Sequence, residues 1–330
     1  MSTRIRIADK MSPGHRKILT VTLNPAIDVT YRVAGLAVGE TVRVANVRSR
    51  AGGKGVNVAA VARHLGSDSL VLALTGRTEP DEFRAGLDRL GLPHHLVPAL
   101  DAVRRTVAVV EDDGVTTSLQ ERGPAVAAGI RDEVMAAFRA ELVAGVGAVV
   151  VAGSVPPGLG DETPARLAVL CAEAGIPVVA DVSGAALRAV AKTPSVLVPN
   201  LEELSELAGK RLHDPGEVVA AGRQLVRDGA AAVVATLGEE GVIAVTAGHE
   251  FGVRPVERVI GNPTGAGDAA AAALARHLAA AGAVSEVDWP AALADVVATS
   301  AAAVLRPVAG EVDLEARAGW LGALAVKETA

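Results

Sequence analysis

Apolar residues follow two spacings that take turns along the chain, and this alternation predicts a layered α/β fold. Continuous apolar runs bounded by turn residues are typical of buried strands, whereas apolar residues three or four apart indicate amphipathic helices. The expected strands lie at 17–25, 69–76, 146–153, 176–184, 195–200, 231–238 and 241–248. The expected helices lie at 55–66, 79–91, 130–142, 163–175, 201–209, 215–229, 261–278 and 289–305. Strands that alternate with helices predict a mostly parallel central sheet with helices on both faces.

A second pattern occupies the early part of the chain. Residues 29–34, 41–48, 104–111 and 115–119 alternate apolar and polar positions, as the strands of a half-exposed sheet do. The last two flank Asp113-Gly114, a strong hairpin signal. We expect a small accessory sheet built on one α/β domain, residues 18–330, after a loose leader, residues 1–17.

Composition narrows the class of protein. Hydrophobic residues make up 50% of the chain and aromatic residues only 2%, so aliphatic side chains must fill the core. The net charge of −6 argues against nucleic-acid binding by bulk charge. Glycine and proline interrupt every apolar run, and the leader lacks the apolar core of a signal peptide, so we expect a cytoplasmic protein without a membrane span. The single cysteine, Cys171, lies on an apolar helix face and is expected to be a packed core thiol.

Two glycine-rich junctions are the candidate chemical sites. Ala51–Asn57, "AGGKGVN", joins a strand to a helix. It could bind a ligand through its backbone, or it could be only a tight turn with a surface lysine. Gly265–Asp268, "GAGD", opens a long alanine helix, whose free N–H groups and dipole form an anion site. Asp268 alone is compatible with a helix cap or with a base beside that anion.

The two junctions taken together resemble the signature motifs of the PfkB sugar kinases, which have a ribokinase-like fold. Four further segments fall in the family's order: "TLNPAID", "GSVPPGL", "DVSGAAL" and "PNLEEL". The resemblance covers about residues 18–310 and is strongest to the branch that phosphorylates fructose phosphates and tagatose 6-phosphate. It implies Mg²⁺ with ATP, and it leaves a K⁺ requirement open.

The resemblance assigns the chemistry to the second junction. Asp268 matches the base that deprotonates the sugar hydroxyl. The amides of Gly265, Ala266 and Gly267 match the anion hole around the transferring phosphoryl group, where positioning and electrostatics supply most of the catalysis.

The expected sugar site begins with Asp28 of "NPAID", whose carboxylate can accept two hydroxyls. Gly53, Lys54 and Asn57 match the family's sugar-binding turn and helix start. Arg105 matches the arginine that grips the substrate's phosphate, with Arg104 on the opposite face, and Arg43 matches a lid arginine. A solvated strand charge is the alternative for each arginine.

The nucleotide site is expected at the later strands. Asn200 and Glu203 match the family's Asn-x-x-Glu motif, and Glu203 is expected to act on Mg²⁺ through water. Thr236 and Gly238 match a nucleotide-contacting turn. One departure stands beside this motif, since Val198 occupies a position where related kinases often carry lysine.

The expected activity is phosphorylation of fructose 1-phosphate, with fructose 6-phosphate and tagatose 6-phosphate as alternatives. A β-fructofuranose has two similar hydroxymethyl arms, and the motifs do not decide which one carries the first phosphate. By resemblance, the accessory strands form a lid and pair with a second subunit as a homodimer. A catalytically silent sugar-phosphate sensor is the alternative from another class, and a dinucleotide enzyme lacks its GxGxxG motif.

Overall fold

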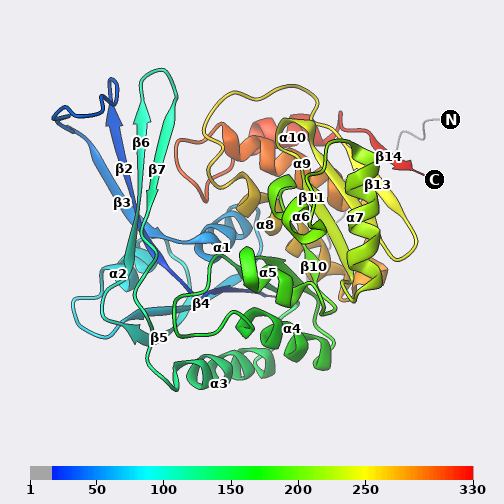
Figure 1. The fold of residues 1–330 in the computed structure, drawn as a ribbon, viewed down its shortest axis with the longest axis horizontal. Coiled ribbons are helices and arrows are strands. Elements are labelled where there is room, and N and C mark those ends of the chain that lie inside the picture. The colour runs from blue at the N-terminus through cyan, green and yellow to red at the C-terminus, as the bar shows by residue number, and fades with distance from the viewer. Residues whose placement is uncertain (1–16, 330) are drawn as a thin grey trace.

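The computed structural model describes residues 17–329. Its main feature is one large central sheet (Figure 1). Its strands lie in the order β14-β13-β12-β11-β10-β9-β8-β1-β4-β5. The bounds are β1 (Ile18–Thr22), β4 (Ser69–Gly76), β5 (His94–Leu100), β8 (Ala148–Ala152), β9 (Val178–Asp181), β10 (Val196–Leu197), β11 (Ala232–Thr236), β12 (Val242–Thr246), β13 (Glu250–Val253) and β14 (Val326–Thr329). Every pairing from β5 to β11 is parallel, and β12, β13 and β14 add an antiparallel edge.

Helices cover both faces of this sheet, which confirms the expected fold class. The bounds are α1 (Lys54–His64), α2 (Glu82–Arg89), α3 (Ile130–Val143), α4 (Thr163–Glu173), α5 (Gly184–Val190), α6 (Leu201–Ala208), α7 (Pro215–Arg227), α8 (Ala266–Ala281), α9 (Trp289–Val304) and α10 (Leu314–Leu321). Helices α1, α8 and α9 share one apolar core with alternate strand residues, and α3, α4 and α5 share another on the opposite face. The strands are buried on both sides, so their sequences are continuously apolar.

Cys171 lies in the second of these cores. It is a free, buried thiol, and burial raises its pKa to about 12. The packed core thiol expected from the sequence is confirmed.

A second, four-stranded sheet projects from the main body beside α2 (Figure 1). Its strands are β2 (Ala26–Val33), β3 (Val47–Gly52), β6 (Arg104–Glu111) and β7 (Thr116–Gln120), in the order β3-β2-β6-β7. We call it the small sheet. The strand expected at 41–48 is misplaced, because pairing with β2 begins only at Val47 and runs to Gly52.

Some elements lacked a clear signal in the sequence. Helix α10 contributes no buried residue, so it shows no apolar stripe. Strand β14 consists of "VKET" and is specified by its pairing with β13. Such polar elements follow from tertiary contacts more than from a periodic pattern.

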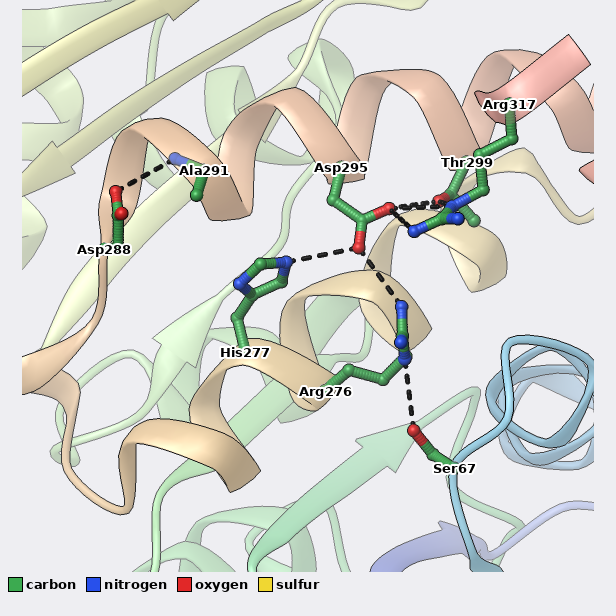
Figure 2. Close-up of polar contacts among 8 residues, drawn as sticks. All are labelled: Ser67, Arg276, His277, Asp288, Ala291, Asp295, Thr299 and Arg317. Atoms are coloured by element: carbon green, nitrogen blue, oxygen red, sulfur yellow. Dashed lines mark hydrogen bonds and ion pairs between the residues drawn. The ribbon is translucent and has the colours of Figure 1, made fainter. Parts of the chain in front are cut away.

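A buried polar cluster fixes α8 against its neighbours (Figure 2). Asp295 of α9 accepts hydrogen bonds from Arg276 of α8 at 3.2 Å and from Arg317 of α10 at 2.7 Å. His277 Nε2 lies 3.2 Å from the same carboxylate, and Arg276 also donates to Ser67 at 3.1 Å. This cluster joins α8 to α9 and α10 at Arg276, ten residues after α8 begins. The candidate base lies in the first turn of the same helix.

None of the helices within residues 17–329 combines the length and the hydrophobicity that crossing a membrane requires. The expected leader, residues 1–17, lies outside the described residues except for Lys17.

Candidate active site

Two cavities open at the carboxyl ends of the parallel strands, where ligands of open α/β sheets bind. The larger cavity, about 460 Å³, lies between the turn after β11, α9 and the segment that precedes α8. The smaller, about 380 Å³, lies between the small sheet and the starts of α1 and α8. Gly267 lines both cavities, so they meet at the first turn of α8.

The start of α8 depends on its two glycines for different reasons. Gly265, the N-cap, has φ of 88°, and a Cβ there would lie 2.6 Å from Ala309 Cβ. Only glycine adopts this backbone without strain. A Cβ on Gly267 would meet no atom within 4 Å, because the space beside it is the cavity. The first turn of α8 therefore borders the cavity at the positive end of the helix dipole, and within it the Ala266 amide donates to Pro263 O at 3.2 Å.

Asp268 lies in this first turn and is buried, with 5% of its surface exposed. Its Oδ2 accepts a hydrogen bond from Asn57 Nδ2 at 2.9 Å. Burial raises the pKa of Asp268 to about 7, reinforced by the charge of Asp181 and opposed by Lys54 and Asn57. A carboxyl group with a pKa near neutrality is suited to take up a proton.

The start of α1 brings a cation to the same place. Gly53, its N-cap, has φ of 104°, and a Cβ there would lie 2.9 Å from Thr22 Cγ2. Lys54 follows as the first helical residue, and its Nζ lies 2.7 Å from Asp181 Oδ1. Burial by itself lowers the pKa of Lys54, but the charges of nearby acids outweigh it and raise that pKa above its usual value.

Asp28 lies on the floor of the smaller cavity. A Cβ on Gly52 would lie 2.0 Å from Asp28 Oδ2, so this glycine makes room for the carboxylate. Burial raises the pKa of Asp28 to about 6, against the charges of Arg50 and Arg104. The smaller cavity thus combines a carboxylate with two guanidinium groups.

The positions of the arginines correct the expectation from the sequence. Arg104 lines the smaller cavity and donates Nη1 to Glu121 O at 2.8 Å. Arg105 turns to the other face of β6, where its Nη2 lies 3.1 Å from Glu82 Oε2. Arg43 is exposed and is absent from both cavities. The alternation between Arg104 and Arg105 was foreseen, but the face assigned to each was reversed.

The pairing of β2 with β6 explains this reversal. Asp28 pairs with Thr106 in a parallel register, so residues of the same parity as 106 share its face. Arg104, Thr106 and Ala108 therefore line the cavity beside Asp28. The inner face of the small sheet is polar, with Thr30, Thr116, Ser118 and Gln120 also facing the cavity.

Thr236 and Gly238 line the larger cavity as expected, beside apolar walls from Val242, Val297 and Val304. Asn200 and Glu203 line neither cavity and instead form a capping box at the start of α6, with both hydrogen bonds at 2.9 Å. An isolated bridge pairs Asn200 with Thr236, so the two turns lie side by side. Burial raises the pKa of Glu203, and the charges of Lys54 and Asp181 also act on it.

Within the described residues, no group of three acidic, histidine or cysteine side chains could hold a metal alone. Among the described residues, Asp181 Oδ2 is buried without a hydrogen-bond partner. Glu203 lies near enough for the charge of Asp181 to help raise its pKa. Mg²⁺ commonly binds one or two carboxylates together with water and substrate phosphates. These two acids fit that mode of binding.

The sequence indicated no role for Arg50 or Asp181, and it predicted Arg104 on the face opposite the phosphate-binding arginine. Asp181 ends an apolar strand at the ligand-binding edge of the sheet, and that position was a usable signal. Arg50 donates to Asn57 Oδ1 at 3.2 Å and to the backbone oxygen of Ala309. The contact with Ala309 spans more than 250 positions, so no local pattern reveals it.

Comparisons with known proteins agree on one family. Residues 20–317 match the sequence model described as pfkB family carbohydrate kinase. A 1-phosphofructokinase from Rhodobacter capsulatus is 36% identical over 263 residues, which cover 78% of this chain and 82% of that protein. An ATP-dependent 6-phosphofructokinase isozyme 2 from Mycobacterium tuberculosis is 32% identical over 268 residues, covering 79% and 77%. The crystal structure of phosphofructokinase-2 from Escherichia coli in complex with potassium superposes with a TM-score of 0.84 at 24% identity, covering 93% of this chain and 99% of that one.

Proposed function

We propose that this chain, which belongs to the pfkB family of carbohydrate kinases, transfers the γ-phosphoryl group of ATP to fructose 1-phosphate. The chain is a sugar-phosphate kinase, as its family and its 1-phosphofructokinase relatives indicate. The proposed product is fructose 1,6-bisphosphate. The identity of the substrate and the roles of individual residues are what we propose.

The observation that carries this proposal is the meeting of two cavities at Gly267. A nucleotide in the larger cavity would direct its phosphates toward the first turn of α8, because the N–H groups and the dipole at a helix start attract an anion. A sugar in the smaller cavity would lie on the other side of that turn, beside Asp268. The phosphoryl group then has a short path between the two ligands.

In the proposed step, Asp268 acts as the general base. The sugar hydroxyl loses its proton to the carboxylate as its oxygen attacks the γ-phosphorus. The new P–O bond forms while the bond to the bridging oxygen of ATP breaks, and the electron pair leaves with ADP. The amides of Gly265, Ala266 and Gly267 would stabilise the charge on the equatorial oxygens.

Asp28 and Asn57 would orient the sugar in the smaller cavity. The carboxylate of Asp28 can accept two hydroxyls. Arg104 takes the role that the sequence had suggested for Arg105, since it faces the cavity and can bind a phosphate through two hydrogen bonds. Its Nη2 has no acceptor among the hydrogen bonds of the described residues. The small sheet covers this site and would exclude water when the ligands are bound.

The larger cavity would hold the nucleotide. Its apolar walls suit a flat base, and Thr236 and Gly238 lie at the turn expected to contact the nucleotide. Asp181 and Glu203 would hold Mg²⁺ through water. Mg²⁺ bound with ATP supplies positive charge at the phosphates. A K⁺ requirement stays an expectation of the family resemblance.

The choice of fructose 1-phosphate follows the relatives' names. The 1-phosphofructokinases are 34% and 36% identical to this chain, against 32% for the 6-phosphofructokinase isozyme. A coupled ADP-release assay over fructose 1-phosphate, fructose 6-phosphate, tagatose 6-phosphate, fructose and ribose tests it. We expect the highest kcat/KM for fructose 1-phosphate. Preference for a free sugar would refute the phosphate-binding role of Arg104.

We also propose a homodimer formed through the small sheet. Exposed apolar side chains gather on its strands and connecting loops, including Val38, Val47 and Leu119. Sedimentation velocity should give a dimer at micromolar concentration, and Leu119→Glu should shift the protein to monomer. Val143→Glu, at an exposed site on α3, serves as the control and should leave the dimer intact. A monomeric wild type would contradict this assembly.

A further inference from the structure

The two cavities contain few cations, and most of them are already engaged. Within the described residues, their lining includes Arg50, Lys54, Arg104 and Arg258. Arg258 pairs with Glu239 at 2.8 Å in the larger cavity. Arg50 donates to Asn57 Oδ1 and to the backbone oxygens of Ala51 and Ala309. Arg104 donates to the backbone oxygens of Asn24 and Glu121.

Lys54 lies closer than these arginines to the acids at the strand ends. It begins α1, and a Cβ on Gly153 at the end of β8 would lie 3.7 Å from Lys54 Cβ. Its Nζ meets Asp181 at the end of β9, and Asp268 and Glu203 are near enough for their charges to act on it. Lys54 therefore lies between the candidate base and the candidate Mg²⁺ acids, where the γ-phosphoryl group must pass.

The ammonium group of Lys54 is available to a ligand. The side chain keeps 42% of its surface exposed, because it opens into the smaller cavity. An ammonium has three N–H donors, and the contact with Asp181 uses one of them. Asp181 thus holds Lys54 in position and leaves donors for an incoming anion.

The chain also lacks a cation at the neighbouring strand end. Val198 follows β10, is apolar and is 5% exposed, so this strand end offers no charge to a phosphate. A polyanionic triphosphate that enters from the larger cavity needs positive charge near its γ-phosphate. Arg50 also lies near Asp268, but Asn57 and Ala309 hold its guanidinium, so Lys54 is the group of the described lining that can provide this charge.

We propose that Lys54 contacts the transferring γ-phosphoryl group as a catalytic residue. This assignment rests on the proposed path of the phosphoryl group past the start of α8. It differs from the sugar-binding role that the sequence pattern suggested for Lys54. An interaction made mainly in the transition state lowers kcat when lost, whereas a sugar contact raises the KM for the sugar phosphate.

The test measures kcat and both KM values for Lys54→Met with fructose 1-phosphate and ATP. We expect kcat to fall roughly 10²- to 10³-fold, as when one anion-hole donor is removed, with the KM of the sugar phosphate nearly unchanged. Lys192→Met, at an exposed position outside both cavities, is the control and should keep wild-type kinetics. Unchanged kcat in Lys54→Met, or a raised sugar KM at unchanged kcat, would overturn the proposal.

A chemical rescue separates the role of the charge from any folding defect. Lys54→Cys alkylated with 2-bromoethylamine carries an ammonium at nearly lysine length, and bromide is released. Buried Cys171 should not react, because burial raises its pKa to about 12. Alkylation should restore most of the lost kcat in the same purified sample, and failure to restore it would count against a role for the charge.

Comparing Asp268→Asn with Lys54→Met separates the role of Lys54 from the proposed phosphoryl transfer at Asp268. If Asp268→Asn loses turnover while Lys54→Met retains it, the Lys54 assignment alone is wrong. If both retain turnover, the proposed path past α8 fails as well.

Discussion

Two adjacent arginines on β6 show how one position decides the role of a residue. Arg104 faces the smaller cavity with Asp28, whereas Arg105 pairs with Glu82 outside it. Hydrogen bonds to charged groups contribute roughly 1.5–3 kcal/mol, equivalent to about 10- to 100-fold in affinity. Arg104→Ala should therefore raise the KM for the sugar phosphate by about that factor in steady-state assays. Arg105→Ala is the neighbouring control, and an equal rise in its KM would reverse the assignment.

The ionisation of Asp268 sets the expected pH dependence. Burial raises its pKa to about 7, with Asp181 and Asp28 adding to the effect and Lys54 and Asn57 opposing it. A base acts only when deprotonated, so kcat/KM should fall about tenfold per pH unit below 7 and level off above it. A pH profile between about 5.5 and 8.5 measures this, with the residual activity of Asp268→Asn as the control. A flat profile across that range would be incompatible with this base.

Within helix α8, Gly267 keeps the first turn open to both cavities because it has no side chain. A Cβ there meets no protein atom within 4 Å. Gly267→Ala should fold at least as well as wild type, with a gain of up to about 1 kcal/mol in the free energy of unfolding. Turnover should nevertheless drop sharply, because the methyl group occupies the space of the phosphoryl group.

Gly319 on α10 offers a matched control, since a Cβ there also meets nothing within 4 Å. Gly319→Ala should gain similar stability with unchanged turnover. Urea denaturation and the ADP-release assay together measure both effects. Full activity in Gly267→Ala would show that this amide does not face the reacting group.

The opposite part of α8 depends on the Asp295 cluster (Figure 2). Burial alone raises the pKa of Asp295, but His277, Arg317 and Thr299 outweigh it and hold that pKa well below its usual range. Asp295→Asn leaves the buried Arg276 and the half-buried Arg317 without their carboxylate and should cost about 3–5 kcal/mol of unfolding free energy at pH 7. Urea denaturation measures this cost.

The sign of the pH effect follows from the lowered pKa. The stability contributed by Asp295 is present above the unfolded pKa of about 4 and is lost as the pH falls further. The difference between wild type and Asp295→Asn should therefore shrink in acid. Asp288→Asn on the same helix keeps its N-cap contact and should match wild type. Equal midpoints for all three proteins at pH 7 would contradict this account.

In the whole molecule, β5 and β13 were not among the expected strands, but most strands of the central sheet could be predicted because they are buried on both faces. Their continuous apolar runs end at Gly153, Asp181 and Asn200, so the ligand edge was visible as well. Helix α10 and strand β14 could not be predicted, since α10 buries no residue and β14 depends on its pairing with β13.

The candidate site divides in the same way. Asp268, Asp28 and the glycine junctions follow from local sequence, because a turn and a helix start are local structures. The face of Arg104 depends on the register between β2 and β6, and the contacts of Arg50 depend on a loop more than 250 residues away. Alternation fixes which residues share a face, but only tertiary pairing decides which face meets the ligand.

We propose that the ligands of both cavities react beside Asp268, where the cavities meet. The most direct measurement compares kcat and ATP affinity in Asp268→Asn with those of wild type, with fructose 1-phosphate as acceptor. The account predicts a loss of kcat of roughly 10²–10⁴-fold or more, with ATP binding by calorimetry largely unchanged. Turnover near the wild-type rate in this variant would contradict it.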